Sequence, residues 1–204
     1  MKFKKPSLFQ KRESAPSPVL IVSGLPRSGT SMMMKMLEAG GVPVLTDELR
    51  TADEDNPRGY YEFERVKAMD KGDTAWVADA RGKVVKVISA LLQYLPADYE
   101  YRVIFMHRNL TEVLGSQRKM LRHRAADEDA VSDEEMTRLF EMHLADVKGW
   151  LDRQPHMQTL HVDYNAMLVD PHPFVIQIDD FLGMGLDRKA MQAVVDPALY
   201  RNRG

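Results

Sequence analysis

Eight residues, GLPRSGTS from Gly24 to Ser31, restrict the possible folds of this 204-residue chain more than any others. They follow a short apolar run at 18–23 and lead into a stretch typical of a helix at 30–39. A buried strand, a glycine-containing turn and a helix in this order aim backbone N–H groups at an anion near the helix N-terminus. The eight residues therefore predict a phosphate-binding loop.

This loop differs at one position from the Walker loop of nucleoside triphosphatases, which reads G-x-x-x-x-G-K-[ST]. Thr30 stands in the place of the lysine, and the nearest cation is Arg27, inside the loop. A cation there meets an anion from the side, which suits one phosphate with an adjoining group better than a triphosphate with Mg²⁺. The residues expected to contact this anion are Leu25, Pro26, Arg27, Ser28, Gly29, Thr30 and Ser31.

Strands and helices alternate along the rest of the chain. Strands are expected at 83–88, 101–106 and 157–162, and helices at 110–124, 173–182 and 188–195. Ser132 and Glu135 form a capping box that begins one more helix. Its apolar residues at helical spacing are Met136, Leu139, Phe140, Val147, Trp150 and Leu151. The alternation predicts an α/β protein with a three-layer P-loop-type fold, in which helices flank a central parallel sheet.

The domain organisation is expected to be simple. Neither an internal repeat nor a Gly/Ser-rich linker divides the sequence, so residues 19–204 are expected to form a single domain. Residues 1–18 are expected to be a flexible basic arm. The segment 46–64 is polar, charged and rich in turn residues, and it is long enough to be a functional lid.

Composition excludes several classes of function. The net charge of −2 gives the chain no electrostatic reason to bind nucleic acid, and no apolar run reaches the ~20 residues of a membrane span. The absence of cysteine excludes disulfides, thiolate nucleophiles and cysteine metal sites, and the six histidines lack metal-ligand spacing. The basic N-terminus lacks the apolar core of a signal peptide. We therefore expect a cytoplasmic protein that uses no metal.

A second candidate element runs from Val103 to Ser116, VIFMHRNLTEVLGS. Arg108 follows an expected strand, at the sheet edge where α/β proteins bind ligands, and Ser116 lies on the second turn of the next helix. A guanidinium and a hydroxyl in one cleft suit a dianionic phosphate. From the residues alone, a surface ion pair for Arg108 and a packing role for Ser116 are favoured over phosphate binding.

The two elements together resemble the sulfotransferases that use 3′-phosphoadenosine-5′-phosphosulfate (PAPS). GLPRSGTS resembles the 5′-phosphosulfate-binding loop of that family, and the strand, turn and helix around Arg108 and Ser116 resemble its 3′-phosphate-binding element. The resemblance covers 19–121 and continues through LHVDYNAMLVDP and FLG. It implies PAPS as the donor, Arg27 beside the sulfonate, and Arg108 with Ser116 on the 3′-phosphate. The family's glycine-rich C-terminal segment is missing, and Arg201 and Arg203 stand there instead.

The resemblance also implies roles in the chemistry. Lys86 matches the lysine of the family's Lys-Thr-His stretch, but no histidine follows it. Asp47-Glu48-Leu49-Arg50 matches the Glu-Glu-Thr-Arg segment of the tyrosylprotein and Golgi-type members, whose second glutamate is the base. Glu48 is therefore the expected base, Lys86 the cation on the leaving group and Arg27 the cation on the sulfonate. Expected acceptor-binding residues are Arg50, Arg58, Tyr60 and Tyr61.

Three functions fit the sequence. The first is a sulfotransferase that moves the sulfonate of PAPS to a hydroxyl or amine by in-line transfer with a carboxylate base. The second is a P-loop kinase or NTPase-like enzyme, which would need the lysine that Thr30 replaces. The third is a non-catalytic module that binds a nucleotide or a phosphopeptide. It would keep Arg27, Arg108 and Ser116 but would not need Glu48 or Lys86. The acceptor is not identified by the sequence.

Overall fold

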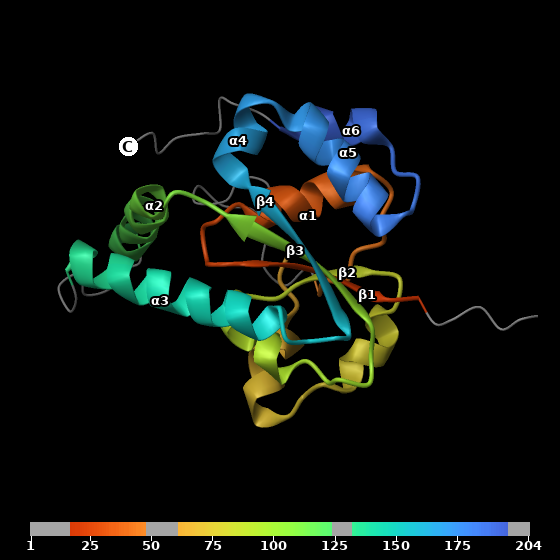
Figure 1. Cartoon of the computed structure of the whole chain (residues 1–204), viewed down its shortest axis with the longest axis horizontal. Coiled ribbons are helices and arrows are strands. Elements are labelled where there is room, and N and C mark those ends of the chain that lie inside the picture. The colour runs from red at the N-terminus through yellow and green to blue at the C-terminus, as the bar shows by residue number, and fades with distance from the viewer. Residues whose placement is uncertain (1–16, 48–60, 124–131, 196–204) are drawn as a thin grey trace, which may run out of the picture.

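The computed structural model of the chain describes residues 17–47, 61–123 and 132–195. Within these ranges four parallel strands form one sheet in the order β2-β1-β3-β4 (Figure 1). The strands are β1 (Val19–Gly24), β2 (Val84–Lys86), β3 (Tyr101–His107) and β4 (Met157–Asp163). All four carboxyl ends therefore lie along one edge of the sheet, where open α/β sheets bind their ligands.

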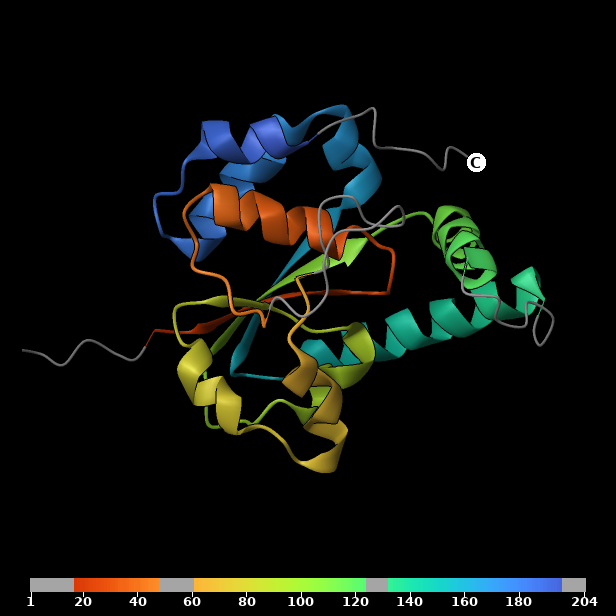
Figure 2. The ribbon, with the colours of Figure 1, turned by 180° about the vertical axis from the view of Figure 1, so that it is seen from behind.

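The helices cover the two faces of the sheet in separate groups (Figures 1 and 2). One face carries α1 (Thr30–Ala39), α4 (Tyr164–Val169), α5 (Pro171–Leu182) and α6 (Arg188–Val194). The other face carries the 3₁₀ helices η1 (Glu64–Lys71), η2 (Ala75–Ala80) and η3 (Ser89–Tyr94), with the C-terminal half of α3 (Asp133–Leu151). Helix α2 (Leu110–His123) follows the carboxyl end of β3. The predicted α/β fold with a parallel sheet between helix layers is confirmed.

The central strand β1 is apolar along its whole length because both of its faces are covered. Leu20 and Val22 belong to the core beneath α1, whereas Val19 and Ile21 belong to the core beneath the 3₁₀ helices. All four side chains are at most 3% exposed. The two-sided burial explains why the sequence shows an unbroken apolar run instead of an alternating one.

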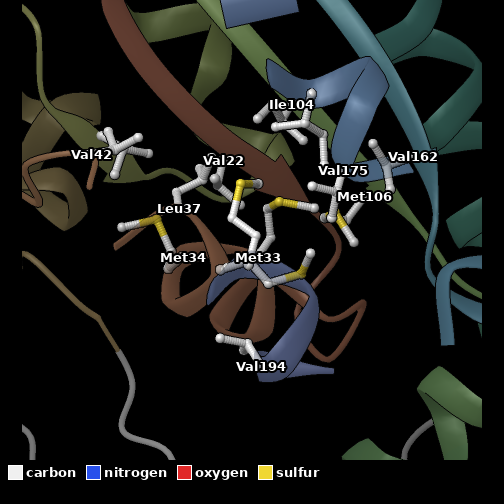
Figure 3. Packing of buried hydrophobic residues seen from close by; sticks show 14 of the residues in the cluster. Val22, Met33, Met34, Leu37, Val42, Ile104, Met106, Val162, Val175 and Val194 are labelled. Atoms are coloured by element: carbon white, nitrogen blue, oxygen red, sulfur yellow. The ribbon is translucent and has the colours of Figure 1, made fainter. Parts of the chain in front are cut away.

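The methionine-rich start of α1 lies in the first of these cores. Met33, Met34 and Leu37 pack beside Val22 and Ile104 of the sheet (Figure 3). All of them are essentially inaccessible to solvent. Truncating a core side chain of this size to alanine typically costs about 2–5 kcal/mol of unfolding free energy. The packing fixes α1 against β1, and with it the loop that joins them.

Helix α3 differs from its prediction at one apolar position. Ser132 caps the helix as expected, since its Oγ accepts a hydrogen bond from the Glu135 N–H at 3.2 Å. Leu139, however, is 48% exposed instead of buried. The reason is that only the C-terminal part of α3 packs on the sheet, while its N-terminal part extends along α2, where Arg118 pairs with Asp133.

Other boundaries shift by a few residues. The strand predicted over 83–88 is shortened to β2 at 84–86, because this edge strand leaves the sheet after Val87 donates its N–H to the carbonyl of Val22. Helix α4 and the three 3₁₀ helices were not predicted. No helix in the described ranges is long and apolar enough to cross a membrane. The proposed basic arm lies outside them, except for its last two residues.

Candidate active site

The loop between β1 and α1 depends on unusual backbone at three positions. Gly24, Arg27 and Gly29 have φ values of 147°, 72° and 95°. A Cβ atom at Gly24 would lie 2.5 Å from Ser28 Oγ, and one at Gly29 would collide with the Tyr164 ring. The two glycines therefore let the loop close tightly. A non-glycine residue at positive φ, such as Arg27, is uncommon and recurs at functional sites.

The loop has the features of an anion site. Ser28 is 1% exposed, and its Oγ has no hydrogen-bond partner among the described residues. Helix α1 begins after Gly29, which offers no side-chain cap, and no acidic residue stands in its first turn. A buried hydroxyl without a partner costs about 1–3 kcal/mol, and an oxyanion in the loop would remove that cost. The same anion would be attracted by the N–H groups of the helix N-terminus. These residues therefore fit a phosphate.

The loop is joined directly to the element around Arg108. Arg27 Nε donates to Ser116 Oγ at 2.8 Å, and Arg108 Nη1 donates to the backbone carbonyl of Arg27 at 3.0 Å. Ser116 is buried on the second turn of α2, and Arg108 directly follows β3. The structure thus brings together the three residues that the two motifs predicted for donor binding.

A buried carboxylate holds the Arg108 side chain in place. Glu112 Oε2 accepts from Arg108 Nε at 2.9 Å, and the two side chains are only 7% and 9% exposed. The other carboxylate oxygen accepts from Asn165 Nδ2 at 2.8 Å, and Asn165 Oδ1 accepts from the Asn109 N–H at 3.1 Å. The Tyr164 ring centroid lies 4.6 Å from the guanidinium carbon of Arg108. Contacts from the loop, α2 and α4 therefore fix the orientation of this guanidinium.

Three further residues belong to the site and were not predicted from the sequence: Glu112, Tyr164 and Asn165. A signal for Glu112 was present, because it follows Arg108 by four residues, the spacing of a helical ion pair. The other two residues begin α4, which Asp163 caps by accepting a hydrogen bond from the Ala166 N–H at 2.9 Å. An aspartate in the N-cap position is also readable from sequence, but nothing local connects α4 to Arg108.

Lys86 lies at the same edge of the sheet. It is the last residue of β2 and pairs in register with Val22, two residues before Gly24. Its side chain is half-buried. The predicted leaving-group cation thus stands beside the start of the loop, at the carboxyl edge that Arg108 also borders.

Tyr61 lies near the other end of α1 from the loop. Its hydroxyl donates to Glu38 Oε2 at 2.5 Å, about 12 Å along the helix from its start. Burial and then the hydrogen bond to the Glu38 carboxylate raise the pKa of Tyr61 well above its usual range. Its acceptor-binding role stays a prediction.

The remaining predicted residues, Glu48, Arg50, Arg58, Tyr60, Arg201 and Arg203, lie outside the described residues. The described residues on either side of 48–60 are bonded to each other: Thr46 Oγ1 donates to the Glu62 carbonyl at 2.7 Å, and Asp47 Oδ2 accepts from the Glu64 N–H at 2.6 Å. The two ends of the proposed lid therefore meet.

Two histidines form a close pair at the ends of β3 and β4. His107 Nε2 and His161 Nδ1 are 2.8 Å apart, which requires one nitrogen to donate to the other. Burial, followed by the charge of His161, lowers the pKa of His107, and burial lowers the pKa of His161. In the described ranges no three metal-ligating side chains come together.

A solved sulfotransferase shares this fold, and other solved structures align more weakly. The sulfotransferase STF1 from Mycobacterium tuberculosis H37Rv aligns with a TM-score of 0.61 and 18% identity, over 88% of this chain and 71% of that one. Retinol dehydratase, solved with androsterone and the inactive cofactor PAP, aligns with a TM-score of 0.48 and 15% identity, over 86% of this chain and 62% of its own. The sulfotransferase domain from the curacin biosynthetic pathway aligns with a TM-score of 0.47 and 17% identity, over 83% of this chain and 75% of that one. No curated protein sequence matches significantly.

A family model described as "Sulfotransferase domain" matches residues 17–202. The match spans both motifs, the sheet and the helices on both of its faces. It favours sulfonate transfer over phosphoryl transfer and over a module that only binds nucleotides. Because nearly the whole chain is matched, this protein belongs to the sulfotransferase family, whose enzymes move a sulfo group from PAPS to an acceptor.

Proposed function

We propose that this sulfotransferase holds PAPS along the carboxyl edge of its sheet and passes the sulfo group to a hydroxyl or amine of the acceptor. The observation that carries this placement is the junction of Arg27, Ser116 and Arg108. It puts the cations of two separate motifs at one edge, beside a buried hydroxyl of Ser28 that fits an oxyanion.

In this proposal the two phosphates of the donor have separate partners. Within the loop from Leu25 to Ser31, the backbone N–H groups of the residues other than Pro26 and the hydroxyls of Ser28, Thr30 and Ser31 hold the 5′-phosphate. Arg108 and Ser116 hold the 3′-phosphate, since a guanidinium presents its N–H donors in a planar fork. The bond from Arg108 to the Arg27 carbonyl supports this assignment, because it fixes the spacing between the two sites.

The chemical roles follow from where charge develops. The acceptor oxygen forms a bond to sulfur as the bond from sulfur to the phosphate oxygen breaks, and the acceptor proton passes to a base. Arg27 stabilises charge on the sulfonate, and Lys86 stabilises charge on the departing phosphate. Glu48 takes the proton, and Arg50, Arg58, Tyr60 and Tyr61 contact the acceptor.

We also propose a cytoplasmic location. The support is the complete absence of cysteine from the 204 residues, which fits a reducing compartment. Fractionation of cells that express the tagged full chain tests this. Recovery of the protein outside the cytoplasmic fraction would contradict it.

The donor site is tested by thermal unfolding with adenosine 3′,5′-bisphosphate (PAP). A ligand that binds only the folded state adds about 2.7 kcal/mol of unfolding free energy at ~100 times its Kd. We expect PAP to raise the melting temperature equally with and without EDTA. A shift that needs Mg²⁺, or one that ATP produces and PAP does not, would contradict the proposal.

A further inference from the structure

A serine and a histidine meet just beyond the proposed leaving-group cation. Ser89 follows Lys86 by three residues, begins η3 and is 3% exposed. Its Oγ lies 2.8 Å from Nε2 of His143, which comes from the middle of α3. The half-buried imidazole and the hydroxyl thus connect the end of β2 to a helix that is more than 50 residues away in sequence.

This pair lies at the edge of the sheet where the donor is proposed to bind. Val87 donates its N–H to the Val22 carbonyl at 3.0 Å, and the chain then leaves the sheet. Val22 is itself two residues before Gly24, the first residue of the phosphate-binding loop. Ile88 and Ser89 therefore stand past the carboxyl end of β2, on the side of Lys86. An acceptor in contact with Ile88 and Ser89 would therefore lie close to the proposed leaving-group cation.

Each member of the serine–histidine pair has an exposed apolar residue near it along its own element. Ile88 is 39% exposed and precedes Ser89 directly. Leu139 is 48% exposed and lies one helical turn before His143, on the same face of α3. Small-molecule sites combine apolar side chains with a few polar groups that fix the orientation of the ligand.

We propose that Ile88, Ser89, Leu139 and His143 form an acceptor subsite, and that the acceptor is an alcohol carried on an apolar scaffold. This inference rests on the proposed donor site. The serine–histidine pair hydrogen-bonds the polar end of the acceptor and orients it toward the sulfur. Ile88 and Leu139 contact the apolar body. The subsite binds and positions the acceptor, while the transfer step keeps the roles given above.

The test compares two acceptors with radiolabelled PAPS: 1-octanol, an apolar alcohol, and glucose, a polar one. We expect transfer to 1-octanol and little to glucose. Leu139→Asp and His143→Leu should each raise the KM for 1-octanol about tenfold or more, with a smaller change in kcat. His143→Gln should restore part of the affinity, since its amide can still bond Ser89. Leu139 is exposed, so its substitution should not prevent folding.

The matched control is Val169→Asp, which places the same charge on an apolar residue that is 87% exposed at the end of α4. It should keep the parent KM, and all variants should keep the parent affinity for PAP. A parent enzyme that does not bind PAP would refute the donor site itself. A parent that binds PAP but prefers glucose, or variants at Leu139 and His143 that keep the parent KM, would refute only the acceptor subsite.

Discussion

Arg27 and Ser116, 89 residues apart in the sequence, are joined by a 2.8 Å hydrogen bond from Arg27 Nε to Ser116 Oγ. This bond ties the phosphate-binding loop to α2. Arg27 itself has a left-handed backbone conformation, with φ of 72°, which in this loop is otherwise adopted by glycine. The two proposed phosphate sites are therefore positioned by a shared contact. A substitution of Ser116 should alter the position of Arg27 in the loop.

Ser116→Ala tests this coupling. We expect weaker binding of PAP, because the variant loses a hydroxyl donor to the 3′-phosphate and the partner of Arg27. A hydrogen bond to a charged group contributes about 1.5–3 kcal/mol, so the Kd should rise roughly tenfold or more. Titration calorimetry with PAP measures it.

Ser132→Ala is the matched control for that variant. It removes the N-cap of α3, which should lower stability by about 1 kcal/mol, while the PAP affinity stays at the parent value. If Ser116→Ala also binds PAP like the parent, Ser116 is a packing residue only.

Arg108→Ala should discriminate between two nucleotides. PAP carries a 3′-phosphate and adenosine 5′-phosphosulfate does not, so we expect a large loss of affinity for PAP and a small loss for the phosphosulfate. Equal losses would place Arg108 on the other phosphate or in a structural role. The PAP affinity of Arg108→Lys should lie between those of the parent and Arg108→Ala, since lysine keeps the charge and loses the planar fork of donors.

The same substitution should also lower stability. Glu112 is buried and accepts from Arg108, and removing one partner of a buried ion pair typically costs about 3–5 kcal/mol. Glu112→Gln in the Arg108→Ala background should recover part of the melting temperature, because the uncompensated charge is gone. Such a recovery would show that the loss of stability comes from the broken ion pair with Glu112, separately from any loss of PAP binding.

The parts of this fold that sequence predicts well are those set by neighbours along the chain. The bounds of α1 match their prediction at both ends, because a glycine precedes Thr30 and the Gly40-Gly41 pair follows Ala39. The order of strands and helices follows from the same local signals. Arg27, Arg108 and Ser116 were predicted from two local motifs, and they meet because parallel strands bring their carboxyl ends to one edge.

Contacts between elements that are distant in the sequence could not be predicted from local patterns. The position of α4 brings Tyr164 against Gly29 and Arg108, and no local pattern in the residues of α4 specifies that neighbour. Leu139 has helical apolar spacing, but its burial depends on whether the sheet extends beneath that part of α3. The hydrogen bond between Ser89 and His143 likewise depends on how α3 crosses η3.

Glu48→Gln tests the proposed base. Donor affinity should remain nearly unchanged, because a base on the acceptor side does not contact the nucleotide, while single-turnover transfer should slow by at least ~10²-fold. Lys86→Ala should also slow transfer, through weaker stabilisation of the departing phosphate. Rates are measured with radiolabelled PAPS and an acceptor found by screening cell extract.

Asp47→Asn is the neighbouring control for the base. Asp47 accepts the Glu64 N–H at 2.6 Å, so we expect a change in stability and little change in the transfer rate. Transfer at the parent rate by Glu48→Gln would mean that another group takes the proton. A loss as large in Asp47→Asn would point to that neighbouring carboxylate instead.

The pair of His107 and His161 should make the fold sensitive to acid. Burial lowers the pKa of both imidazoles, and Lys148 lowers them further, while Asp163 acts in the opposite direction on His107 and Asp152 on His161. The unfolded chain, with histidines near pKa 6.5, therefore binds more protons than the folded chain in weak acid. The free energy of unfolding is therefore highest above about pH 6.5. It falls as the pH drops through the lowered pKa values of the two histidines in the folded chain.

His161→Gln should reduce this loss, because it removes one titrating group and the neighbouring charge that opposes protonation of His107. We expect a smaller fall in melting temperature between about pH 7.5 and pH 5 than in the parent. His172→Gln, on α5 and away from the pair, should keep the parent dependence. Since His107 directly precedes Arg108, the affinity for PAP should also become less acid-sensitive in His161→Gln. An unchanged pH dependence of the melting temperature would show that the close contact of the two rings has no energetic role.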